Sequence, residues 1–443
     1  MAAIDRDSEQ YSSCADFVNL RHITCIAVRC SALKYWRFGA KEGGNFRMTM
    51  TSTRPSTATL GLAALAVGTF AIGTSEFVVM GMLSLLSSSL NVTVSAAGGV
   101  ITAYALGVAV GAPSMIVLLN RVPRPRALLI LLSLFVASHL AAAVAPSFEW
   151  LLVVRFVGGL PHGAFFGLAA VVGTSLVDPS RHGRAIAVIL AGLTIANVVG
   201  VPAGTWLAQV LGWRSAFVAI AVLGAIAFAA VRFAIPDELE LARPSLRQEF
   251  QGLLNRHSML TVATVAIGFA GLFTAYAYID PLMVEQAGLD SKYLPWVLAF
   301  VGVGFTLGTS LGGWAADRNV KVTLIGGLVV FGLFLALLPS VANSIIGMAL
   351  ALFFVGAAAF VAELAIQKRL IDQAPLAPTV ASATSQSAFN IANALGASAG
   401  SVVISSGWSI SMLGPVGAAF VLTGVIVAAY SLYIERQGIA NKH

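Results

Sequence analysis

Charged residues are scarce in this 443-residue chain, where Asp, Glu, Lys and Arg together supply only 10% of the residues. Ordinary soluble domains hold about 25%. Hydrophobic residues make up 58% of the chain. This shortage of charge excludes an ordinary soluble protein and indicates an integral membrane protein that lies in the lipid bilayer.

Cysteine is nearly absent as well. The chain has only Cys14, Cys25 and Cys30, and none after residue 30. No two of them have the C-x-x-C spacing that is typical of metal and redox sites. We therefore expect no metal site, no cofactor and no disulfide in the hydrophobic body of the protein.

A zinc-hydrolase motif and a nucleotide-binding loop are also missing. The sequence has neither an H-E-x-x-H motif nor a Walker A loop, which disfavours a zinc hydrolase and a nucleotide-driven pump. His139 and His162 lie in different apolar runs, and neither has a carboxylate three or four residues later. We therefore expect that the chain is not an enzyme.

Long apolar runs are what the sequence has in abundance. A membrane span needs about 20 mostly apolar residues. Twelve stretches of this kind occur, at 58–84, 95–119, 127–146, 150–176, 185–210, 215–235, 258–284, 293–315, 322–340, 344–367, 381–405 and 411–434. The sequence thus predicts an all-α integral membrane protein with twelve transmembrane helices.

The connections between these spans are short, with one charged exception between spans six and seven. We expect five parts: an N-terminal extension 1–57, a first six-helix bundle 58–235, a central loop 236–257, a second six-helix bundle 258–434 and a tail 435–443. Residues 1–47 contain no spanning run and no good signal peptide. We expect translation to begin at Met48 or Met50, with a disordered cytoplasmic extension as the alternative.

Basic residues lie on one side of the predicted spans. If both termini are cytoplasmic, the opposite loops hold only Arg214 and Lys292. The cytoplasmic loops then hold Arg121, Arg124, Arg126, Arg181, Arg184, Arg232, Arg243, Arg247, Arg256, Arg318, Lys321, Lys368 and Arg369. Such a bias fixes orientation, so the net charge of +7 reflects topology, and we expect no nucleic-acid partner.

The two halves of the chain resemble each other. Gly107 and Gly111 precede Asn120–Arg121 in the first half, and an offset of 197 residues places them on Gly304 and Gly308, ahead of Asp317–Arg318. Repeated halves are typical of transporters that expose a site alternately on each side of the membrane.

Four stretches carry a resemblance to a known family. They are GTSEFVVMG (73–81), RFVGGLPHGAFFG (155–167), GLTIANVVGVPAGTWLAQVLGWRSAF (192–217) and GGWAADRNVK (312–321). The last three resemble the span-four pattern, the span-five antiporter motif and the loop signature of the major facilitator superfamily. Over residues 58–434 the chain is most similar to the twelve-span drug/proton antiporters, among their sugar-efflux and chloramphenicol-resistance-like members.

This resemblance implies two pseudo-symmetric six-helix bundles around a central cavity lined by spans one, four, seven and ten. It implies a monomeric, multi-pass protein of the bacterial inner membrane that exports a small molecule, such as a drug or a sugar, by antiport with protons. Proton-coupled uptake of a small metabolite is the alternative. A membrane-embedded enzyme and a non-transporting receptor are more distant alternatives for the function.

The sequence departs from the family pattern at several positions. In the first-half loop signature, Ile116 replaces the glycine and Asn120 replaces the aspartate. Ser84 stands where relatives usually have proline, and Asp280 where they usually have a small uncharged residue. Any charge relay through the first-half loop is therefore doubtful.

Two segments are candidates for conformational change. In span five, Pro202 removes a backbone donor and kinks the helix, with Gly200 and Gly204 on either side and Asn197 just before. We expect this kink to form a seal or pivot between the halves, with static packing as the alternative. Asp317 and Arg318 lie at a predicted cytoplasmic helix end. We expect them to form a latch that closes the inward side, with an ordinary solvated pair as the alternative.

Embedded ionisable residues are the candidates for proton or substrate binding, because such residues usually face a bundle interior and pair with one another. Glu76 in span one is the main candidate, with Arg155 in span four as its expected partner. His162 shares a helical face with Arg155, and Asp280 near the outer end of span seven is the fourth candidate. A structural ion pair is the alternative for Glu76.

Two further embedded residues are assigned other roles. We expect Glu363 to form an interfacial pair with the nearby Lys368, and His139 to be a hydrogen-bonded packing residue.

Overall fold

The computed structural model describes residues 55–237, 239, 255–373 and 378–440. The description below concerns the compact unit Thr53–His443. The expectations for residues 1–47, including a start at Met48 or Met50, lie outside the described residues. So does most of the charged segment between spans six and seven.

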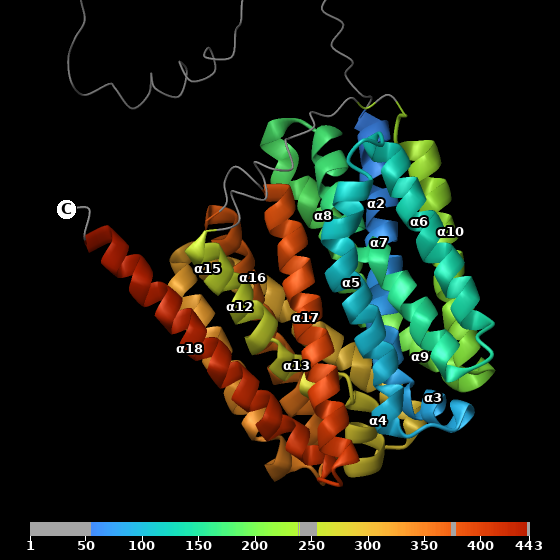
Figure 1. Ribbon diagram of the computed structural model, residues 1–443, viewed down its shortest axis with the longest axis vertical. Coiled ribbons are helices and arrows are strands. Elements are labelled where there is room, and N and C mark those ends of the chain that lie inside the picture. The colour runs from blue at the N-terminus through green and yellow to red at the C-terminus, as the bar shows by residue number, and fades with distance from the viewer. Residues whose placement is uncertain (1–54, 238, 240–254, 374–377, 441–443) are drawn as a thin grey trace, which may run out of the picture. The chain divides into compact units, whose positions relative to one another are not determined.

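Every regular element in the described part of the chain is helical (Figure 1). The long helices of the first half are α2 (Pro55–Val78), α5 (Gly99–Leu118), α6 (Arg124–Ala143), α7 (Phe148–Ser175), α8 (His182–Ile195), α9 (Val201–Leu211) and α10 (Trp213–Ala234). Those of the second half are α12 (Arg256–Gly268), α13 (Ala270–Tyr276), α15 (Leu294–Ala336), α16 (Ile345–Gln373), α17 (Pro378–Ser405) and α18 (Leu413–Ala440). Shorter elements used below are α3 (Leu83–Leu90), α4 (Val94–Ala97), the π-helical turn η4 (Ala196–Gly200) and α14 (Ile279–Pro281).

Eleven helical stretches in the described residues are long and apolar enough to cross a membrane. One of them, Ser291–Ala336, has 46 residues and would measure about 69 Å as one helix, over twice the thickness of a bilayer core. It is broken at Asn319, whose φ of −157° and ψ of 95° are not helical. The Asn319 Oδ1 accepts the Val322 N–H at 3.1 Å, as an N-cap does. This stretch therefore supplies two spans, which gives the expected twelve.

The sequence repeat that was inferred from glycine spacing corresponds to the same helix–helix contact in both halves. A Cβ atom at Gly107 of α5 would overlap the Phe156 carbonyl oxygen of α7, and one at Gly111 would overlap that of Leu160. In the second half, a Cβ at Gly304 or Gly308 of α15 would overlap the carbonyl oxygens of α16 residues Phe353 and Ala357. The same 197-residue offset relates both the glycines and their partners. Small residues let membrane helices approach closely, so each half uses the same contact.

Several helix contacts join the two halves. α5 packs along α17, and α15 packs against α9 and η4. In Figure 1, α17 lies beside α5 between the first-half helices and α12 with α18. These contacts bring spans two and five of the first half against spans eleven and eight of the second.

The glycine contact of the second half should be necessary for stability. Replacing Gly308 with Val should destabilise the protein by about 1–3 kcal/mol, because its side chain must displace the Ala357 backbone. The measurement is thermal unfolding of the purified protein in detergent. Gly313→Val on the same helix is the matched control, since no atom lies within 4 Å of a Cβ there. Equal melting temperatures for the two variants would contradict this packing.

Candidate functional site

A cavity of about 390 Å³ lies between the two halves. Its walls come from α2, α7, α8 and η4 of the first half and from α15, α16 and α17 of the second. Thr174, Ile186 and Ile371 line it near the ends of their helices. These ends adjoin the turns that hold most of the basic residues, and we call this side of the protein the basic end.

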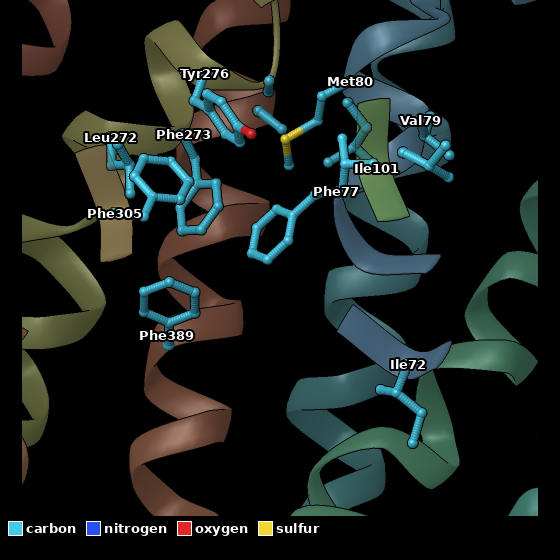
Figure 2. Close-up of a cluster of buried hydrophobic side chains, with 14 of the residues drawn as sticks. Ile72, Phe77, Val79, Met80, Ile101, Leu272, Phe273, Tyr276, Phe305 and Phe389 are labelled. Carbon is cyan, nitrogen blue, oxygen red and sulfur yellow. The ribbon is translucent and has the colours of Figure 1, made fainter. Parts of the chain in front are cut away.

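The cavity has an aromatic wall and two acidic groups. Five phenylalanines line it: Phe77, Phe166, Phe305, Phe360 and Phe389. Figure 2 shows Phe77 projecting from α2 toward Phe305 and Phe389 of the second half. The acidic residues are Glu76 of α2 and Glu363 of α16. Pockets of this volume, mostly apolar with a few polar groups, are typical of small-molecule sites.

Glu76 is buried, with 3% of its surface exposed. Its Oε2 lies 3.8 Å from His162 Nε2 of α7, and Asn390 of α17 lies beside the carboxylate. Its Oε1 has no hydrogen-bond partner in the described part of the chain. Glu76 therefore meets one first-half partner and one second-half neighbour, with one oxygen left over.

His162 links Glu76 to the interior of the first half. Its Nδ1 lies 3.1 Å from the Tyr104 hydroxyl of α5, and Phe166 stacks on its ring at 5.2 Å. If the hydroxyl donates to Nδ1, the N–H of the neutral imidazole is on Nε2 and faces Glu76. With that tautomer, the bond to Tyr104 leaves the Nε2–H of His162 facing the carboxylate.

Arg155 lies close to this cluster but has a different partner from the one expected. Its two terminal nitrogens donate to Ser75, to the hydroxyl at 3.1 Å and to the carbonyl oxygen at 3.2 Å. Its guanidinium lies over the Tyr104 ring, 4.0 Å from the centroid. Among the described residues, the basic side chain within 4 Å of the Glu76 carboxylate is His162 and not Arg155. The expected pair fails because the guanidinium engages Ser75, the residue just before Glu76.

His139 of α6 behaves as the sequence suggested. Its Nε2 lies 2.5 Å from the Ser75 hydroxyl and its Nδ1 lies 2.7 Å from the Phe135 carbonyl oxygen. Nδ1–H therefore donates to that carbonyl, and Nε2 accepts from Ser75. Arg155, Ser75 and His139 form one directed hydrogen-bond chain that holds α2, α6 and α7 together.

Asp280 lies elsewhere and is not a member of this cluster. Its Oδ2 accepts the backbone N–H of Ser84 at 2.7 Å, in the first turn of α3, where helix N–H groups lack internal partners. It does not line the cavity. Ser84 and Asp280, two of the four positions that the sequence analysis set apart from the family pattern, thus meet across the halves. The expectation that Asp280 shares a space with Glu76 is corrected, because α14 carries it to the end opposite the basic end.

Other bonds across the halves lie at that opposite end. Ser95 of α4 and Ser401 of α17 exchange hydrogen bonds of 2.8–3.0 Å. Gln209 of α9 donates to the Ser291 carbonyl oxygen at 2.7 Å. With Asp280 and Ser84, these contacts close the end away from the cavity.

The span-five motif lies at the interface between halves. The π-helical turn η4 precedes Pro202, and such turns often mark functional sites. The Asn197 backbone abuts Gly302 of α15, whereas a Cβ at Gly200 would overlap the Thr74 hydroxyl of α2 and one at Gly204 would press on Val78. Asn197 also lines the cavity. Span five therefore fits between span one of its own half and span eight of the other.

Asp317 and Arg318 do not bond to each other or across the halves in the described residues. Lys368 Nζ lies 2.6 Å from Asp317 Oδ1, within the second half. Arg318 donates to the Trp314 carbonyl oxygen at 3.1 Å and lies over its ring. Since Lys368 is engaged by Asp317, the expected Glu363–Lys368 pair is wrong, and Glu363 instead lines the cavity.

Four residues of the site were not predicted from sequence: Ser75, Tyr104, Glu363 as a cavity residue, and Asn390. Glu363 carried a usable signal, since it is a lone carboxylate in the apolar run 344–367, as Glu76 is in its own run. Tyr104 and Asn390 carried none, because only packing between distant helices gives them a role.

A family model described as the Major Facilitator Superfamily matches residues 65–401. This chain belongs to that superfamily. It is 39% identical to the Escherichia coli (strain K12) inner membrane transport protein YdhP over 357 residues, which are 81% of this chain and 92% of that protein. It is 34% identical to a Streptomyces lividans chloramphenicol resistance protein over 374 residues, 83% and 94% of the two chains.

A solved structure supports the same fold for this member of the superfamily. The crystal structure of a D-xylose-proton symporter matches with a TM-score of 0.68 at 17% identity, covering 84% of this chain and 97% of that one. At this identity the likeness shows the fold alone. The chain is thus a multi-pass membrane protein of a transporter superfamily with the major facilitator fold.

The bond between Ser84 and Asp280 should couple the two residues energetically. Ser84→Pro removes the N–H donor at a helix start, where proline is tolerated, and leaves a buried carboxylate unpaired. We expect a loss of about 1–3 kcal/mol in the native background, and a much smaller loss when Asp280 is already Ala. Thermal unfolding of the four proteins of this double-mutant cycle measures the coupling. Additive effects would show that the bond contributes nothing.

Proposed function

We propose that this protein exports a small molecule in exchange for protons, with Glu76 as the residue that binds and releases the proton. The observation that carries the proposal is the place of Glu76, a buried carboxylate in the wall of a cavity between two packing-related halves. Ionisable residues buried in membrane spans mark ion and substrate pathways in general. The transport-protein and drug-resistance relatives support the same class.

The partners of Glu76 suit a group that changes charge. His162 Nε2 faces one oxygen, and a neutral imidazole can donate to the carboxylate there. Asn390 can exchange its amide donor for its carbonyl acceptor when the carboxyl gains a proton. Glu76 thus has neighbours that can donate to the ionised carboxylate and one that can accept from the protonated form.

The two ends of the protein suit alternating access. The cavity reaches the basic end, which the positive-inside bias assigns to the cytoplasm, and bonds between the halves close the opposite end. Opening to the other side requires these bonds to break while the basic end closes. Each inward-moving proton can supply about 2.3 kcal/mol per 100 mV of membrane potential for that cycle.

The chain contains two serine motifs of the kind found in hydrolases, and their positions do not support catalysis. G-x-S-x-G occurs at 308–312 and at 396–400, but both lie inside helices, α15 and α17. A nucleophile elbow needs a sharp strand-to-helix turn. Ser310 instead donates to the Thr306 carbonyl oxygen of its own helix.

Glu76→Gln should abolish proton-driven transport and preserve binding, because an amide keeps the size and hydrogen bonding of the carboxyl but does not titrate. The measurement is accumulation of a compound panel, including chloramphenicol, in proteoliposomes under an imposed pH gradient, beside binding to the purified protein. Glu149→Gln is the control, since Glu149 is exposed at the start of α7. Gradient-driven transport by Glu76→Gln at the native rate would make Glu76 a structural residue. Gradient-driven uptake in the direction of proton flow would indicate symport.

Gly200 tests whether span five must slide against span one. Gly200→Leu should block transport but allow insertion, because its side chain would press on Thr74. Gly200→Ala should slow transport and lower stability less than the Leu variant, because its Cβ alone must displace the Thr74 hydroxyl. The assay is the same flux, with detergent size-exclusion to confirm folding. Gly183→Leu is the control on the same span, as nothing lies within 4 Å of a Cβ there. Native flux in both Gly200 variants would show that this contact is static packing.

A further inference from the structure

Glu363 is a half-buried carboxylate in the cavity wall, and the cations near it in the sequence are paired with other residues. It lines the cavity from α16, across from Glu76 on α2. Lys368 pairs with Asp317, and Arg369 pairs with Glu435 at 3.0 Å and donates to Ser431. In the described part of the chain, Glu363 itself has no recorded ion pair or hydrogen bond. When it is ionised, its carboxylate is therefore available to a cation in the cavity.

When Glu363 is ionised, the cavity wall carries a negative charge that no lining residue in the described part of the chain offsets. Of the described residues that line it, none is Lys, Arg or His, and the remaining polar groups are neutral side chains such as Asn197, Gln367 and Gln386. If His162 is charged, it offsets Glu76 alone, and Glu363 still has no counter-charge. In a low-dielectric bundle, an unpaired carboxylate attracts a cation strongly and repels an anion.

The aromatic wall adds a second feature that favours cations. Phe305 and Phe360 stack with ring centroids 4.6 Å apart, and both line the cavity on the same side as Glu363 of α16. Aromatic faces attract cations through their quadrupole, most strongly where water is excluded. They also bury flat apolar groups. The unpartnered, buried Oε1 of Glu76 offers a further acceptor in the same cavity.

We propose that Glu363 is a substrate-binding residue and that this cavity takes organic cations with an apolar, aromatic body. This inference rests on the proposed transport function and adds a substrate class to it. Glu363 binds the positive group, the phenylalanines contact the apolar body, and Glu76 remains the proton site. Two carboxylates on opposite halves allow proton and cation to bind to different groups of one cavity.

The experiment measures binding of two probes of nearly equal shape and opposite charge. Tetraphenylphosphonium and tetraphenylborate are titrated calorimetrically into the full chain in phosphatidylcholine nanodiscs, with empty nanodiscs as the blank for lipid partition. We expect the cation to bind and the borate to show no binding above the blank. Glu363→Gln should weaken cation binding about tenfold, a change of about 1.4 kcal/mol, and should leave binding of neutral chloramphenicol unchanged. Glu149→Gln should leave cation binding at the native value.

Several results would overturn the proposal. Borate binding equal to that of the cation, no cation binding above the blank, or unchanged cation binding in Glu363→Gln would each do so. The proposed function fails separately: it falls if no compound moves under a pH gradient, even where the cation binds through Glu363. Conversely, native cation binding by Glu363→Gln in a protein whose flux still depends on Glu76 removes only the role of Glu363.

Discussion

The need to accommodate a carboxylate inside a membrane-spanning bundle organises the first half of this protein. A charge at the centre of a span costs about 2.5–3.5 kcal/mol on insertion scales, and Glu76 is almost fully buried. His162 faces it, Tyr104 orients His162, and Arg155 stacks on Tyr104 while it binds Ser75. Glu76, His162, Tyr104 and Arg155 thus contact one another in turn, and among the described residues Glu76 Oε1 and Arg155 Nε have no hydrogen-bond partner. Loss of one of these side chains is therefore expected to disturb the others, as in a coupled polar network.

The two halves share their packing but not their chemistry. The offset of 197 residues relates the glycine contacts of α5–α7 to those of α15–α16. In the sequence, the same offset aligns Glu76 with Phe273 and Arg155 with Leu352. The second half has instead acquired its own carboxylate, Glu363, at a position that corresponds to Phe166. A symmetric scaffold with an asymmetric set of ionisable groups can rock as two similar bodies while each half presents a different group to the cavity.

Much of the fold followed from the sequence for plain physical reasons. Apolar runs of spanning length predicted the helices because lipid leaves the backbone no other partner, and the glycine offset predicted the repeat. The break at Asn319 fell between the predicted spans 293–315 and 322–340. Partners of the charged residues were predicted less well. Arg155 was expected to bind Glu76 and binds Ser75, and Lys368 was expected to bind Glu363 and binds Asp317, because depth in a span does not fix the direction of a side chain.

The sequence by itself determined which residues enter the membrane, which of them are ionisable, and which helices can approach closely, since each of these depends on local composition. Only the tertiary structure decided what the ionisable groups meet. It brought Ser84 and Asp280 together from different halves, removed Asp280 from the cluster around Glu76, and placed Glu363 in the cavity wall. These outcomes depend on the rotation of each helix about its axis and on contacts between distant segments, and no pattern within one span records either.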